Sequence, residues 1–359
     1  MKLYTCSNCD NPLYFENNIC LNCQHPVGFD KDTIDLLTLE AKEGNQYADM
    51  SGKNQLYRYC ENAIHSTCNW LVPVDAASPF CAACQLNRII PTLSSPENLS
   101  RWKRIEIAKH RLVYSLLRLQ LPFHAKEDEE SDGIAFDFMA DVSPENRVMT
   151  GHNNGTITLN IEEADEEQRV RHKLDLGERY RTLLGHFRHE IGHYYWEVLV
   201  KDKPAIEKFR QIFGNEQKDY GEALKAYYAT GAPANWQDGF ISPYATAHPW
   251  EDWAETWSHY FHLMDTVETA YAFGIHINPV AVNKDQDMQA NIDRDPYRIA
   301  SFDAIIKMWI PFTFAINSLN RSIGHEDFYP FVISPAVINK LQFIHEVCGG
   351  KRLISARKN

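Results

Sequence analysis

Long hydrophobic runs are missing from this 359-residue chain. No stretch reaches the roughly 20 apolar residues that a helix needs to cross a bilayer. The first residues are polar and rich in cysteine, and they lack the apolar segment of an export signal. With 44% hydrophobic and 23% charged residues, the composition is that of an ordinary globular protein. We therefore expect a cytoplasmic protein of roughly two or three domains, without a membrane partner.

An excess of basic residues is also missing. The chain has 36 lysines and arginines against 48 aspartates and glutamates, which gives a formal net charge of −12. This balance disfavours a surface that tracks nucleic-acid phosphates over the whole protein, although a local basic patch stays compatible with it. Nucleic acid is therefore not expected as a partner.

Cysteine is nearly absent after residue 84, since Cys348 is the one later example among nine. The other eight are concentrated near the start, where a missing export signal argues against disulfides and for metal thiolates. The first four form two Cys-x2-Cys pairs, which together supply a complete tetrahedral shell for a structural zinc ion. Iron in the same thiolate site is the alternative. The four ligands are Cys6, Cys9, Cys20 and Cys23.

A second cysteine cluster follows and predicts a second structural zinc site. Cys81 and Cys84 form a regular pair, whereas Cys60 and Cys68 have seven residues between them and do not. His65 is an alternative ligand at this site. Cys60 or Cys68 is otherwise a small buried apolar residue.

Beyond the cysteines, the pattern changes from strand-like to helical. Residues 31–55 resemble a polar connector with some helical or strand content, and residues 91–100 a linker. A helix is predicted from Arg101 to Pro122, followed by alternating strands at 134–138 and 156–161. After Glu162 the chain is mostly helical. This predicts an α+β protein with a cysteine-rich region at 1–90 and a mainly helical domain with a small sheet at 100–359.

Residues 181–200 are predicted to form a helix that carries His189-Glu190-Ile191-Gly192-His193. The two histidines are one turn apart, so both imidazoles can bind one zinc ion. Glu190 is rotated about 100° from His189, where it can take the proton of a water activated by the metal. Gly192 leaves room for the backbone of a neighbouring strand.

A second helix, predicted to start at Pro249, offers a third ligand. Glu251 and Glu255 are one turn apart among tryptophans, where carboxylates need partners. Glu251 can bind the metal, and Glu255 can accept the second N–H of a ligating histidine. The alternative is that both are acids favoured near a helix N-terminus.

Two histidines and one glutamate leave one coordination position open, which is the catalytic arrangement of zinc. A donor that stabilises an oxyanion is expected beside it. Tyr244 and His248, just before the second helix, are the candidates.

Several motifs resemble a family of bacterial zinc-binding metallopeptidases that carry an N-terminal zinc ribbon. They are TGHNNG (150–155), LLGHFRHEIGHYYW (183–196), HPWEDWAETW (248–257), NSLNRS (317–322) and YPF (329–331). The resemblance covers essentially the whole chain and implies a zincin-like, gluzincin-type peptidase domain behind a zinc ribbon. It implies His189, His193 and Glu251 as ligands and Glu190 as the base. In such folds a peptide adds to an edge strand. Residues 156–161 are the candidate, with an interior strand as the equal alternative.

Together these features predict a zinc metallopeptidase with one catalytic and two structural zinc ions, acting on a peptide or protein. A metal hydrolase of another amide is one alternative. Another is a zinc-ribbon regulator that binds protein or nucleic acid and has an inactive His-Glu-x-x-His unit. The ribbon is expected to recruit a protein or to cover the cleft.

Overall fold

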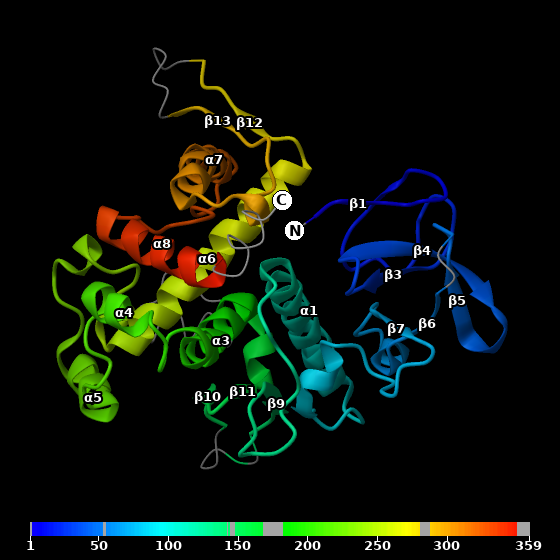
Figure 1. The fold of residues 1–359 in the computed structure, drawn as a ribbon, viewed down its shortest axis with the longest axis horizontal. Coiled ribbons are helices and arrows are strands. Elements are labelled where there is room, and N and C mark those ends of the chain that lie inside the picture. The colour runs from blue at the N-terminus through cyan, green and yellow to red at the C-terminus, as the bar shows by residue number, and fades with distance from the viewer. Residues whose placement is uncertain are drawn as a thin grey trace. The chain divides into compact units, whose positions relative to one another are not determined.

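The chain divides into two compact units, Met1–Phe187 and Arg188–Asn359, in a computed structural model (Figure 1). The structure describes residues 2–52, 55–141, 143, 148–167, 182–280 and 288–349. Within these ranges, no helix is both long enough and apolar enough to cross a membrane.

The cysteine-rich region is built on strands. A small hairpin, β1 (Tyr4–Thr5) and β2 (Pro12–Leu13), precedes an antiparallel sheet in the order β3-β4-β5-β6-β7. A bridge between Phe29 and Trp70 also joins the first of these strands to the start of the last, around a core of Leu39, Tyr57 and Leu71. The strands are β3 (Val27–Asp30), β4 (Asp35–Lys42), β5 (Gln46–Asp49), β6 (Leu56–Tyr59) and β7 (Leu71–Pro73).

Residues 31–55, predicted as a polar connector with some regular structure, thus contain two of the strands of this sheet. The alternation of apolar and polar residues that marks a strand is weak in this segment, because the second half of β4 is largely exposed. Pairing with β3 and β5 on either side, a long-range feature, makes the segment a strand.

Helix α1 (Pro96–Leu119) starts five residues earlier than predicted from Arg101, because Ser95 caps it by accepting a hydrogen bond from the backbone of Asn98. It ends at Gln120, whose φ of 54° stops the helix before Pro122. Its buried face includes Trp102 and Leu112. The apolar spacing expected from the sequence is therefore the one that packs.

A four-stranded sheet in the order β10-β11-β9-β8 follows. Its strands are β8 (Asn87–Ile89), β9 (Ala135–Met139), β10 (Gly151–Asn153) and β11 (Thr156–Asn160). β11 pairs with β10 on one side and with β9 on the other. The prediction that residues 156–161 are an edge strand is therefore wrong, since a tight turn places β10 outside β11; the interior alternative is correct.

Two helices carry the candidate ligands of the second unit. α3 (Leu183–Leu199) contains both histidines of the motif, while residue 181, its predicted start, lies outside the described residues. α6 (Pro249–Ala272) starts at Pro249 as predicted and contributes fully buried Trp253 and Trp257. A Cβ atom added at Gly192 would lie 3.1 Å from the Trp257 side chain and 3.2 Å from Cα of Ala254. The neighbour that Gly192 admits is thus a helix and not the expected strand.

α6 is the central helix of this unit, and it contacts α4, α7, α8 and the short helix η6. Figure 1 shows α8 crossing α6. The remaining elements are α4 (Ile206–Phe213), α5 (Tyr220–Thr230), η6 (Tyr244–Thr246), β12 (His276–Ile277), β13 (Ala290–Asn291), α7 (Phe302–Ser322) and α8 (Pro335–Gly349). α6 therefore positions its acidic residues from the middle of the core.

Candidate metal centres

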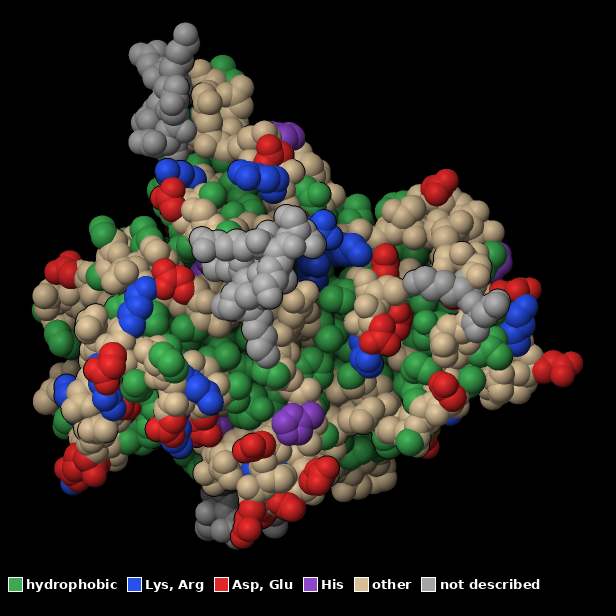
Figure 2. Space-filling model, viewed as in Figure 1, with side chains coloured by type: hydrophobic (Ala, Val, Ile, Leu, Met, Phe, Trp, Pro, Cys, Tyr) green, Lys and Arg blue, Asp and Glu red, His purple; other side chains and the backbone are tan. Residues whose placement is uncertain are grey.

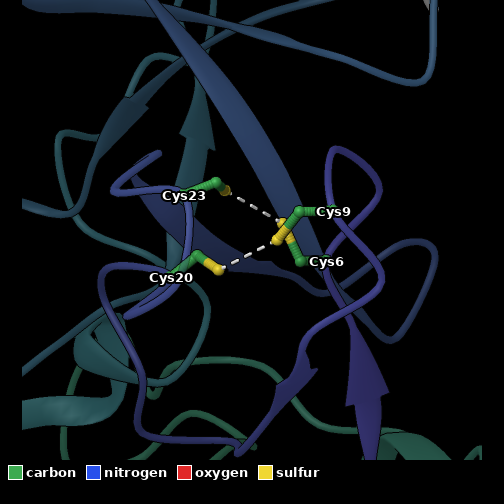
Figure 3. Close-up of side chains that lie close together, drawn as sticks. All are labelled: Cys6, Cys9, Cys20 and Cys23. Carbon is green, nitrogen blue, oxygen red and sulfur yellow. Dashed lines mark hydrogen bonds between the residues drawn. The ribbon is translucent and has the colours of Figure 1, made fainter.

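The first four cysteines converge on one point (Figure 3). The Sγ atoms of Cys6 and Cys23 are 3.6 Å apart, as are those of Cys9 and Cys20. Sulfurs held about 2.3 Å from one zinc ion at tetrahedral angles lie about 3.8 Å apart. The residue after each Cys-x2-Cys pair, Asp10 or Gln24, has a positive φ and donates its N–H to the first cysteine of the pair. Both pairs therefore fold into the same turn, and the sulfurs fit a tetrahedral ion.

The second cluster also comes together, including the irregularly spaced pair. The sulfurs of all four cysteines lie within 4.8 Å of one another, and those of Cys68 and Cys81 are 3.7 Å apart. Backbone N–H groups of Cys81 and Trp70 donate to the sulfurs of Cys60 and Cys68. His65, the alternative ligand, packs edge-to-face against Trp102 instead. The structure thus places Cys60, and not His65, in the group.

The third group joins the two helices of the second unit. Oε2 of Glu251 lies 3.0 Å from Nε2 of His189 and 3.7 Å from Nε2 of His193. Nitrogen and oxygen ligands about 2.0–2.1 Å from one zinc ion at tetrahedral angles lie about 3.3 Å apart. Buried Oε2 makes no hydrogen bond with any described residue, although it is so close to His189. Three lone pairs aimed at a common point fit a metal ion.

Two further side chains orient these ligands. Oε1 of Glu255 lies 2.7 Å from Nδ1 of His189, so it accepts the N–H of this ring and leaves Nε2 free for a metal. The Tyr220 hydroxyl donates to Oε1 of Glu251 over 2.6 Å. Burial opposes the ionisation of Glu251, but His193 and His189 outweigh burial and lower its pKa to about 2. The Glu251 carboxylate is therefore charged, and only its Oε1 accepts a hydrogen bond from a described residue.

Tyr220 was missed by the reasoning from sequence. It stands at the start of α5, 31 residues before Glu251, after Asp219, which caps the helix. A tyrosine at such a position has no pattern that distinguishes it from the chain's other sixteen, out of 17 in all. Only the contact between the start of α5 and Glu251 on α6 reveals its role.

Glu190 follows His189 on α3 and is 7% exposed. Its charge is close enough to contribute to the pKa of both His193 and Tyr220. The predicted base is therefore near the ligands, in a protected environment.

The two candidate oxyanion donors lie in different surroundings. The Tyr244 ring is centred 6.0 Å from that of His189 and 5.7 Å from that of Tyr227. His248 caps α6: Nδ1 accepts from the backbone N–H of Trp250, and Nε2 lies 3.2 Å from the carbonyl oxygen of Lys218. Both ring nitrogens of His248 are thus engaged by backbone, which leaves Tyr244 as the better placed donor.

Two all-thiolate groups and one group of two histidines and a carboxylate are donor sets of a zinc-binding protein. Comparison with known proteins agrees. The family described as "Putative zinc-binding metallo-peptidase" matches residues 98–347, and a zinc-ribbon domain matches residues 3–95. The chain belongs to this metallopeptidase family, behind an N-terminal zinc-ribbon module.

Relatives cover almost the whole chain. An uncharacterized protein of Mycobacterium tuberculosis and one of Mycobacterium bovis are each 38% identical over 348 residues, which is 97% of this chain and 95% of each relative. No solved structure matches. With 97% of the chain aligned, the similarity extends over both the ribbon segment and the metallopeptidase segment.

Proposed function

We propose that this protein is a zinc-dependent peptidase of the gluzincin type, with a zincin-like catalytic domain. The observation that carries the proposal is the set of His189, His193 and Glu251, in which Oε2 of Glu251 is buried without a hydrogen bond. A structural zinc site has four protein ligands, whereas this set has three among the residues that the structure describes, as a catalytic site requires.

His189, His193 and Glu251 would hold the zinc ion, which when bound would lower the pKa of a water and polarise a carbonyl oxygen. Glu190 takes the proton of the attacking water and later transfers it to the leaving amine. Glu255 keeps His189 in the tautomer that presents Nε2. Each residue thus has one task, set by its place on α3 or α6.

Tyr244 supplies a hydrogen bond to the oxyanion of the tetrahedral intermediate. Burial, followed by the charge of Glu251, raises the pKa of this hydroxyl above its ordinary value. The hydroxyl therefore keeps its proton and acts as a donor. His248 stays an alternative only if the cap of α6 opens.

The test is Glu190→Gln, assayed against a peptide library with zinc counted by elemental analysis. We expect the variant to lose at least about a hundredfold in turnover, the usual contribution of a general base, and to keep its metal. Glu197→Gln, two turns further along α3 and not among the ligands, is the matched control and should stay active. Cleavage that survives in Glu190→Gln would refute the assigned mechanism.

Peptide specificity is a separate question from hydrolysis. If the library is inert while simple amides are cleaved, the protein is a metal hydrolase of another amide. If neither is cleaved at full zinc occupancy, the unit is a regulator and the peptidase proposal fails. The elemental analysis that counts zinc also distinguishes zinc from iron in the thiolate groups.

The ribbon is proposed to recruit a protein and not a nucleic acid. Tyr14 and Leu21, beside the first cysteine group, are 55% and 75% exposed, which suits an apolar protein contact. Acidic and basic side chains are interspersed on the face in Figure 2, without a broad basic area among the described residues. Binding to RNA or DNA that weakens steeply with salt would contradict this preference.

A further inference from the structure

A histidine outside every predicted ligand set faces the second cysteine group. Nε2 of His110, on α1, lies 3.3 Å from Sγ of Cys68 and 3.7 Å from Sγ of Cys84. Its Nδ1 is 2.6 Å from the backbone oxygen of Glu106, one turn earlier. The ring is only 4% exposed in this position. Both nitrogens thus face acceptors, which fixes the ring with Nε2 directed at two sulfurs.

His110 does not belong to the tetrahedral group itself. The four cysteine sulfurs form one group of mutually close donors, and His110 forms another with Cys84 and Glu106. Because Nδ1 donates to the carbonyl of Glu106, the ring donates from Nε2 to sulfur as an imidazolium, a cation that suits the negative charge of a complete four-thiolate shell. Its role is therefore to orient and stabilise the ligands.

Two residues that precede His110 on α1 add buried charges to this contact. Lys109 and Glu106 are both fully buried and form an ion pair of 2.9 Å. Oε2 of Glu106 lies 3.7 Å from Sγ of Cys84, and Asn87 donates to Oε1. A buried cation is stable only with enough negative partners, and zinc with four thiolates carries a net charge of −2. Loss of the centre would leave His110 without its sulfur partners and Lys109, which keeps its bonds to Asn87 and Glu106, with less negative charge nearby.

These contacts cross the boundary between the two family matches. The cysteines belong to the zinc-ribbon match at 3–95, whereas α1 begins at Pro96 and lies in the metallopeptidase match at 98–347 apart from its first two residues. We infer that the second metal centre fastens the zinc ribbon to the first helix of the peptidase segment, with His110 as the positioning residue. The inference rests on a metal at this centre but not on peptidase activity.

Among the described residues, the cysteines of the first centre bond within the ribbon, for example Cys6 with the hydroxyl of Thr38. The loop between its two cysteine pairs does reach α1, because the Phe15 ring packs 5.3 Å from that of Tyr114 and Glu16 forms a partly exposed ion pair with Arg111. Neither contact involves a ligand of the first centre. Loss of the second metal should therefore affect α1 chiefly around His110, which contacts the sulfurs directly.

One side of the second centre borders a cavity. This cavity of about 500 Å³ is lined by residues of both segments, among them Tyr59, Cys68, Ile107 and His110. The contact between ribbon and α1 is therefore not closed at Cys68, whereas Cys60, Cys81 and Cys84 are buried.

The experiment compares the full-length variants Cys81→Ser and Cys9→Ser, which each remove one ligand from one centre. Hydrogen exchange of the amides of α1 is measured with the zinc content. We expect each variant to lose one zinc per chain, and faster exchange in the middle of α1 in Cys81→Ser alone. Equal protection of α1 in both would overturn the inference.

If Cys81→Ser does not fold, the wild type is followed during gradual removal of zinc by a chelator. Exchange near His110 should then increase together with release of the second thiolate zinc. An increase that accompanies release of another zinc would overturn the inference. Neither readout measures activity. If the inference about the second metal centre fails, the peptidase proposal therefore stands, and if the peptidase proposal fails, the inference about the centre stands.

His110 has its own test in cobalt-substituted protein, whose thiolate bands report the centres. His110→Leu should weaken metal binding at the second centre about tenfold or more, the usual effect of losing an orienting partner. His110→Gln, which keeps an N–H donor, should restore part of it. His124→Leu is the matched control. Unchanged affinity in His110→Leu would refute the role of this side chain.

Discussion

The side chains that hold the ligands in place matter as much as the ligands at the helical centre. Glu251 has two oxygens, and the Tyr220 hydroxyl occupies Oε1. Oε2 alone is then available beside His189 and His193. A carboxylate restricted to one oxygen leaves room for the open position that hydrolysis requires.

Tyr220→Phe removes this hydrogen bond without changing the ring. We expect zinc affinity at the helical centre to fall by about tenfold to a hundredfold, as for other orienting partners of ligands. Competition with a fluorescent zinc chelator measures the change. Tyr227→Phe, on the same helix and stacked on Tyr244, is the control. Equal affinities in the two variants would show that Tyr220 only packs.

At the scale of elements, the site depends on the close approach of α3 and α6. Gly192 faces Ala254 and Trp257, while the ligands stand on either side, His189 and His193 on α3 and Glu251 on α6. A side chain at this position would have to displace backbone or a buried ring. The geometry of the ligands and the packing of the helices are therefore coupled.

Gly192→Ala should separate the two helices by a few tenths of an ångström. We expect a loss of about 1–3 kcal/mol in the free energy of unfolding, typical of overpacking, together with weaker zinc binding. Urea denaturation and zinc competition measure the two effects. Gly221→Ala, on α5, where the nearest atom would be 3.5 Å away on a side chain, serves as the control. Wild-type zinc affinity in Gly192→Ala would argue against the coupling.

α6 also carries a buried histidine that makes stability depend on pH. The Tyr329 hydroxyl lies 2.6 Å from Nδ1 of His259, and Phe331 packs on the ring. Burial, opposed by the charge of Glu255, lowers the pKa of His259 to about 4. The unfolded chain therefore binds this proton more readily, and stability falls as the pH drops from about 6.5 towards 4.

Between pH 7 and pH 5 this histidine should remove about 2 kcal/mol from the free energy of unfolding. His259→Gln lacks the titration and should lose that much less over the same interval. Urea denaturation of both proteins at both pH values measures the difference. Other acids titrate equally in the two, so parallel losses would mean that His259 is not responsible.

At the scale of the whole molecule, the described residues form three candidate metal groups that share no ligand, two in the first unit and one in the second. Each group has its own ligands, so each should be removable without the others. Thiolate groups with four protein ligands should release zinc more slowly than the open helical group. The zinc content of variants thus tests each of the three groups separately.

We expect three zinc ions per chain, and one fewer after removal of ligands from any one group. Suitable pairs are Cys6 with Cys9, Cys60 with Cys81, and His189 with His193, each changed to serine or alanine. Elemental analysis of the purified proteins measures the count. A double variant of the cysteines at 60 and 81 that keeps three zinc ions would contradict the second thiolate site.

Several features could be predicted from the sequence because they are local. Two cysteines in one turn, or two histidines one turn apart on a helix, are brought together by backbone geometry alone. The start of α6 follows the same rule, since Pro249 occupies its first turn, whereas α1 was predicted five residues too late because the cap at Ser95 was not recognised. The division of the chain near residues 90–100 and the roles of the ligands stay predictions.

Tertiary structure decided the rest. In the fold, Cys60 and not His65 lies in the second cysteine group, and β11 is an interior strand. The backbone that approaches Gly192 belongs to a helix. Tertiary structure also added Tyr220, 31 residues from Glu251, and His110, 42 residues from Cys68. The sequence by itself determined which donor atoms could bind metal, because spacing within one turn or helix is local. Which side chains orient them depends on packing between distant segments, which spacing along the chain does not record.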